Sequence, residues 1–75
     1  MKIVVETGLW ARRYVEESKV EIHLPEGSTV MDIIKELNIP ADEAGIAVIR
    51  GEAVSQDFIL KSNDTVTLHP IIIGG

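Results

Sequence analysis

The stretch LPEGSTVMDIIKELNIP, residues 24–40, decides the fold, because it holds the clearest helical pattern in the chain. Its apolar residues Val30, Ile33, Ile34 and Leu37 recur at the spacing i, i+3, i+4 and i+7, which places them on one stripe of a helix. A single stripe of this kind has to be buried against another element. We therefore look for strands on either side of the stretch.

Both ends of this helix carry boundary signals. Thr29 and Asp32 have the spacing of a capping box, with Asp32 in place of the usual Glu or Gln. Asn38 can close the helix, and Pro40 forbids its continuation. Residues 25–27, Pro-Glu-Gly, form a turn that separates the helix from the preceding segment.

Two strands are expected before the helix. Residues 2–7 are rich in β-branched side chains, and residues 18–24 alternate between apolar and polar side chains, as in a half-buried strand. The connection between them, residues 9–17, is longer than a tight turn. We expect its large side chains to fold back onto the edge of the domain: Leu9, Trp10 and Tyr14.

Three further strands are expected after the helix. They are residues 45–50, a short strand around Val54 that follows a turn at 50–53, and residues 65–69. Residues 41–45 are a linker with a possible helical turn, 57–60 a brief turn or helix, and 62–64 a turn. The order β-β-α-β-β-β, with the first and last strands side by side in parallel, predicts an α+β roll with a mixed sheet.

Composition narrows the function. Seventy-five residues suffice for one domain, and a formal net charge of -5 argues against a nucleic-acid-binding surface. The acidic balance suits a basic protein partner or simply keeps a small protein soluble. The chain has no cysteine, and its two histidines lack a ligand-like spacing, so neither a disulfide nor a metal site is expected. No stretch is typical of a signal peptide or of a membrane span, which predicts a cytoplasmic protein that does not enter membranes.

The last residues, HPIIIGG, break the strand pattern. Pro70 has no N–H for a sheet ladder, so the sheet is expected to end near it. Three isoleucines then follow with no later element to bury them, which is a liability in water unless they serve a contact. We therefore expect a folded domain over residues 1–70 and a flexible tail over residues 71–75.

The glycines at 74 and 75 favour chemistry at the chain end. Without Cβ atoms, Gly74 and Gly75 can enter a narrow slot and bring the α-carboxylate close to a nucleotide phosphate. Attack of the Gly75 carboxylate on the α-phosphate of ATP would give an acyl-adenylate that a sulfur or amine nucleophile can displace. The alternatives are a chance pair of glycines, or isoleucines that belong to an ordinary strand.

The chain resembles the ubiquitin-like sulfur carriers of the MoaD and ThiS group. The likeness extends over nearly the whole chain, and three stretches carry it: residues 24–30 entering the helix, residues 46–52 and residues 63–75. The resemblance implies a β-grasp fold and a carrier that is not itself an enzyme. It also implies that an E1-like enzyme of the MoeB or ThiF type adenylates Gly75 with ATP, and that the carrier binds no cofactor permanently.

In this family, sulfur then converts the terminus to a thiocarboxylate, and a MoaE- or ThiG-type enzyme accepts the sulfur for molybdopterin or thiamin thiazole. Gly75 would bear the reactive group, and Gly74 would give access. The partner-binding candidates are His69, Pro70, Ile71, Ile72 and Ile73. Molybdopterin-type carriers usually have Phe-Pro-Pro where this chain has His69-Pro70-Ile71, and thiazole-type carriers usually have a shorter first hairpin, so the acceptor stays open.

Other roles are weighed beside this one. Gly75 could instead become linked to lysines of target proteins, or the chain could be a β-grasp binding module without terminal chemistry. His69 is either a partner contact or a solvated strand end, and the three aromatics, Trp10, Tyr14 and Phe58, are either core plugs or interface residues. The carboxylates Asp32, Glu52, Asp57 and Asp64 are explained by caps and turns and form no catalytic pair.

Overall fold

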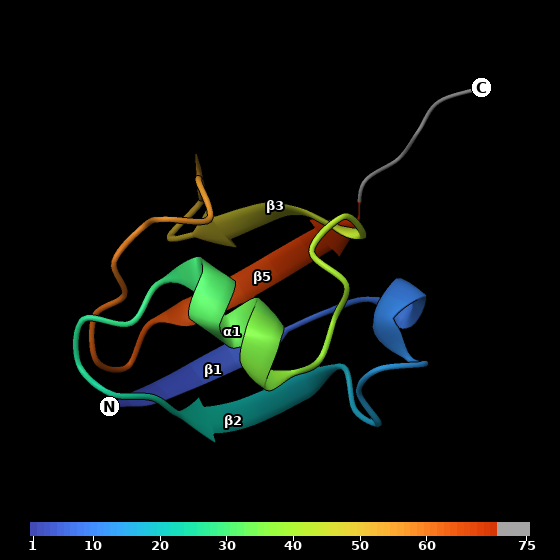
Figure 1. Cartoon of the computed structure of the whole chain (residues 1–75), viewed down its shortest axis with the longest axis horizontal. Coiled ribbons are helices and arrows are strands. Elements are labelled where there is room, and N and C mark those ends of the chain that lie inside the picture. The colour runs from blue at the N-terminus through green and yellow to red at the C-terminus, as the bar shows by residue number, and fades with distance from the viewer. Residues whose placement is uncertain (71–75) are drawn as a thin grey trace.

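The structure, a computed structural model, describes residues 1–70 of the 75 (Figure 1). Its elements follow the predicted order β-β-α-β-β-β, with one additional short 3-10 helix, η1. The bounds are β1 (Lys2–Glu6), η1 (Leu9–Ala11), β2 (Lys19–His23), α1 (Val30–Glu36), β3 (Ala44–Ile49), β4 (Glu52–Val54) and β5 (Thr65–Pro70). The prediction of a tail over residues 71–75 lies outside the described residues.

The five strands form one mixed sheet in the order β2-β1-β5-β3-β4. β1 and β5 are parallel neighbours at its centre, with Val5 opposite Val66, whereas the other pairs are antiparallel. α1 lies across one face of this sheet (Figure 1). The α+β roll predicted from the sequence is therefore confirmed, including the parallel pairing of the first and last strands.

The helix is held by the stripe and the cap that the sequence indicates. Val30, Ile33 and Ile34 are buried, and Leu37, which follows the last helical residue, packs against the same core. The Asp32 carboxylate accepts a hydrogen bond from the Thr29 backbone N–H at 2.8 Å. This bond satisfies a donor that the first turn of a helix leaves free, which matters in a helix of only seven residues.

The sheet supplies the other half of the core. Alternate residues of β1 and β5 point toward α1, because side chains on a strand alternate between faces. Ile3, Val5, Val66 and Leu68 are at most 2% exposed. The remaining core members come from β3 and from the loops: Leu24, Ile39, Ala44, Ala47, Ile49 and Leu60.

The long first connection behaves differently from the prediction in one respect. Trp10 and Tyr14 pack against the core, as expected, but Leu9 is 84% exposed. The reason is geometric, because a single 3-10 turn can press only one side against the domain. Ala11, fully buried, and Trp10 occupy that side, so the prediction for Leu9 was wrong.

The turn between β3 and β4 consists of two residues. Ile49 pairs with Glu52, and the intervening Arg50 and Gly51 have φ values of 51° and 79°. Two successive positive φ angles define the hairpin turn whose twist matches that of the flanking strands, and glycine adopts this conformation without strain. β3 itself begins at Ala44, one residue before the predicted start.

Within residues 1–70, no helix is both long and apolar enough to cross a membrane.

Candidate functional site

The candidate site lies at the end of β5, the last element that the structure describes. β5 continues to Pro70, whose Cα pairs with that of Ala44, and His69 pairs with Ile46. His69 is exposed and Pro70 is partly buried. Pro70 is the last described residue, so the expected end of the sheet near it stays a prediction. The other predicted site residues, Ile71, Ile72, Ile73, Gly74 and Gly75, lie outside the described residues.

A surface without Asp, Glu, Lys or Arg side chains adjoins this end on the face of the sheet away from α1. Residues paired across neighbouring strands share a face, so Ile46 lies beside His69 and Val48 beside Thr67. Ile46 is 53% exposed, although it is a large aliphatic side chain. We call the outward residues Ile46, Val48, Thr67 and His69 the outer patch. The predicted outward positions of Thr67 and His69 are confirmed, because the intervening Leu68 is buried.

The other half of the outer face has a different character. On β1 and β2, Lys2 lies 3.8 Å from Glu21, and Lys19 lies 3.8 Å from Glu6. These cross-strand ion pairs are exposed and contribute little to stability. They do cover the β1–β2 half of the outer face with charged side chains. The half formed by β3 and β5, which includes the outer patch, is therefore the one suited to an apolar contact.

Sequence reasoning did not single out Ile46. Residues 45–49 of β3 are apolar without interruption, so no alternation shows which side chains face outward. A β-bulge between Ala44 and Ile46 also shifts the register, so that both Ala44 and Ala47 are buried. The available signal was the pairing with β5, because a residue opposite the outward His69 must itself point outward.

A side-chain clasp spans the loops at the same end of the domain. The Tyr14 hydroxyl donates a hydrogen bond to the Glu43 carboxylate, which joins the first connection to the loop before β3. This bond, with smaller contributions from desolvation and from the negative charge of Glu43, raises the pKa of Tyr14 above its usual value. Glu43 directly precedes Ala44, the partner of Pro70, so the clasp lies beside the exit of the chain.

Three of the four carboxylates that the sequence assigned to turns and caps have those duties, whereas Glu52 begins β4. Asp32 caps α1, and Asp64 accepts the Lys61 backbone N–H at 2.8 Å in the turn before β5. Asp57 accepts a hydrogen bond from the Ser55 hydroxyl. In residues 1–70, no three Asp, Glu, His or Cys side chains lie close enough together to bind a metal ion.

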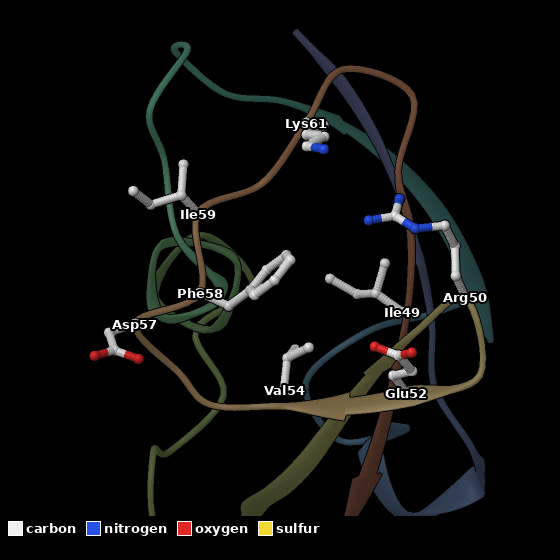
Figure 2. Close-up of a pocket in the computed structure, with 8 residues that line it drawn as sticks. All are labelled: Ile49, Arg50, Glu52, Val54, Asp57, Phe58, Ile59 and Lys61. Atoms are coloured by element: carbon white, nitrogen blue, oxygen red, sulfur yellow. The ribbon is translucent and has the colours of Figure 1, made fainter.

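A separate hollow of about 740 Å³ opens at the far end of the sheet (Figure 2). It is lined by residues from the β3–β4 turn and the loop after β4: Ile49, Arg50, Glu52, Val54, Asp57, Phe58, Ile59 and Lys61. β3 and β5 are antiparallel, so this end is opposite Pro70. Phe58 also packs against the core and thereby acts as a plug. The hollow therefore contributes no residue to the site at the end of β5.

Comparison with known proteins identifies a family and related folds. The model of the ThiS family matches residues 10–75. The solved structure of a putative molybdopterin converting factor, subunit 1, from Pyrococcus furiosus is 26% identical, with a TM-score of 0.75 over 95% of this chain and 98% of that chain. No curated protein matches the sequence.

Two solved structures from Haloferax volcanii are similar in fold. SAMP1 has a TM-score of 0.78 at 16% identity, and all of each chain is covered. Another structure, of small archaeal modifier protein 1, has a TM-score of 0.76 at 13% identity, covering 95% of this chain and 98% of that chain. Identities this low bear on the fold alone. They confirm the predicted β-grasp, ubiquitin-like fold.

Proposed function

Because the chain belongs to the ThiS family of ubiquitin-like sulfur carriers, we propose that Gly75 is its reactive residue and carries sulfur as a thiocarboxylate. The observation that carries the proposal is the match of the family model through residue 75. Support comes from the fold, in which β5 runs to Pro70 beside the outer patch. Members of this family are carriers rather than catalysts, and E1-like enzymes act on them.

The proposed reaction begins with activation. A Gly75 carboxylate oxygen attacks the α-phosphorus of ATP on an E1-like enzyme of the MoeB or ThiF type, and pyrophosphate leaves. A persulfide on a partner then attacks the acyl carbon and displaces AMP, which gives an acyl disulfide. A second partner thiolate attacks the partner's sulfur in that disulfide, which forms a disulfide between the two partner sulfurs and releases the thiocarboxylate. This chain has no cysteine, so both sulfur groups must belong to partners.

The residues of this chain have a supporting part in the reaction. Gly74 and Gly75 lack side chains, which lets the end of the chain enter a slot too narrow for other residues. Pro70, Ile71, Ile72 and Ile73 form the stem that the partner grips, and His69 borders it on the outer patch. For the acceptor, we propose a MoaE- or ThiG-type enzyme, with molybdopterin or the thiamin thiazole as the product.

Intact mass of the protein isolated from its native cells tests the proposal. We expect a species in which one oxygen has been replaced by one sulfur, and we expect it to be absent from a variant that lacks Gly75. If the terminus is instead joined to lysines, larger adducts should appear that also depend on Gly75, and the chain is then a protein modifier. If both species are absent from cells that contain an E1-like enzyme, terminal chemistry is refuted altogether.

A further inference from the structure

Leu9 is an apolar side chain that the fold exposes without using. It is 84% exposed, more than Ile59 at 62% or Ile46 at 53%. Folding therefore gains little from it, since the hydrophobic contribution scales with the area removed from water. Single exposed leucines are common on protein surfaces, so the exposure of Leu9 does not by itself indicate a contact site. The rigidity and the position of its turn supply the further evidence.

The turn that bears Leu9 is fixed in place. The Ala11 N–H donates to the Gly8 carbonyl, and the Arg12 N–H donates to the Leu9 carbonyl, both at 3.2 Å. Beneath them, Ala11 is fully buried and Val15 is 7% exposed. A side chain held on a rigid turn loses less conformational entropy when a partner covers it than one on a loose loop.

Close packing between Gly8 and Trp10 also indicates that the turn is rigid. Gly8 lies against Trp10, so that a Cβ atom at position 8 would come within 3.1 Å of the indole Cδ1. Trp10 in turn packs on the core. Glycine at position 8 therefore permits the backbone to lie directly on the indole, and this contact sets the orientation in which Leu9 is presented.

The turn is also at the end of the molecule where the last described strand, β5, ends. η1 follows β1, and β1 runs parallel to β5, so η1 and the end of β5 share one end of the domain (Figure 1). The Tyr14–Glu43 hydrogen bond holds the two neighbouring loops together there. A protein that receives the residues after Pro70 will face η1.

Charge distinguishes this turn from the rest of the chain. Arg12 and Arg13 lie three and four residues after Leu9 and are exposed, whereas the whole chain carries a net charge of -5. A short turn that exposes one leucine and two arginines suits a recess that is apolar inside and has carboxylates on its rim. Such rim charges act mainly on the association rate and on its salt dependence.

We propose that residues 8–13, the η1 turn, form a second docking contact with the adenylating enzyme. Leu9 enters an apolar recess beside the slot that takes the tail, and Arg12 faces carboxylates on its rim. The inference rests on the proposed function, and it adds a contact that orients the folded domain on the enzyme. Two glycines and a stem can reach a nucleotide, but a contact on the rigid domain is needed to fix the approach of the carboxylate.

ATP–pyrophosphate exchange, with the full chain and the E1-like enzyme of the same cells, tests this contact. Leu9→Ala should raise the KM for the carrier about 10-fold and leave kcat unchanged, because the lost apolar contact is made equally in the ground and transition states. Ile59→Ala is the matched control, since it removes a similarly exposed aliphatic side chain at the opposite end of the sheet. Both variants should keep the Tm of the wild type.

A charge pair sharpens the test. Arg12→Glu should slow association and weaken its salt dependence, whereas Lys61→Glu, which changes the net charge equally on the far hollow, should not. Equal KM values for Leu9→Ala and Ile59→Ala overturn the inference. So does a Leu9→Ala defect confined to sulfur delivery, which would place the contact on the acceptor. An inactive wild-type chain would instead refute the proposed function, on which the inference depends.

Discussion

Asp64 offers the clearest test of how the fold positions β5. Its side chain is 5% exposed and lies in the turn that leads directly into the strand. One carboxylate oxygen accepts the Lys61 N–H at 2.8 Å, and the other accepts a hydrogen bond from Arg50 at 2.5 Å. Asp64→Ala removes both bonds and leaves the backbone N–H of Lys61 without this acceptor.

The magnitude follows from the two bonds taken separately. A hydrogen bond to a charged group contributes about 1.5–3 kcal/mol. The Arg50 side chain is 59% exposed, so its ion pair is screened and contributes only about 0.5 kcal/mol. Asp64→Ala should therefore lower the free energy of unfolding by about 2–3 kcal/mol, and Arg50→Ala by about 0.5 kcal/mol. In a domain of this size, the first loss corresponds to a Tm lower by about 10–20 °C.

Urea denaturation followed by Trp10 fluorescence measures these differences, and the chain has only one tryptophan. Asp64→Asn is the control for shape, because its amide oxygen can still accept the Lys61 N–H, and it should cost less than Asp64→Ala. If Asp64→Ala costs no more than Arg50→Ala, the ion pair explains everything, and the reasoning about the buried backbone bond is refuted.

Three further predictions concern the core, a turn and the Tyr14 clasp. Ile33→Ala should lower the free energy of unfolding by about 3 kcal/mol, measured in the same urea assay, because Ile33 is fully buried. Gly51→Ala should cost about 1 kcal/mol, since φ at this position is 79°, and an unchanged urea midpoint would contradict this. The ultraviolet titration of Tyr14, the one tyrosine, should have a midpoint above about 10 that falls toward 10 in Glu43→Gln. Because the folded pKa is raised, the contribution of the clasp to stability is complete below the unfolded pKa and is lost as pH rises through the folded one.

The elements that sequence predicted well are those with local signals. The α1 stripe, its Thr29–Asp32 cap and the alternation of β5 each depend on residues within a few positions of one another. The parallel pairing of β1 with β5 was also predicted, as an arrangement that the order β-β-α-β-β-β allows. Long-range structure was therefore inferred from a small set of possible topologies.

The features that sequence missed depend on contacts between distant segments. The exposure of Ile46 follows from the bulge in β3 and from its pairing with His69 of β5, and a uniformly apolar strand contains neither piece of information. Leu9 was placed on the domain because it is apolar, but the space beside η1 is taken by Ala11 and Trp10. The sequence does not show which of several neighbouring apolar side chains will occupy a surface that has room for only some of them.

The placement of polar side-chain contacts suggests how stability and reaction can coexist in so small a domain. Met1, Asp32 and Asp64 make their hydrogen bonds at the end opposite the exit of the chain, around the first residues of β1, α1 and β5. The exit end shows the Tyr14–Glu43 clasp and exposed apolar side chains. A substitution at the exit end that impairs activation while the Tm stays constant therefore reports a lost partner contact. A substitution at the opposite end that impairs activation and also lowers the Tm reports an unfolded carrier.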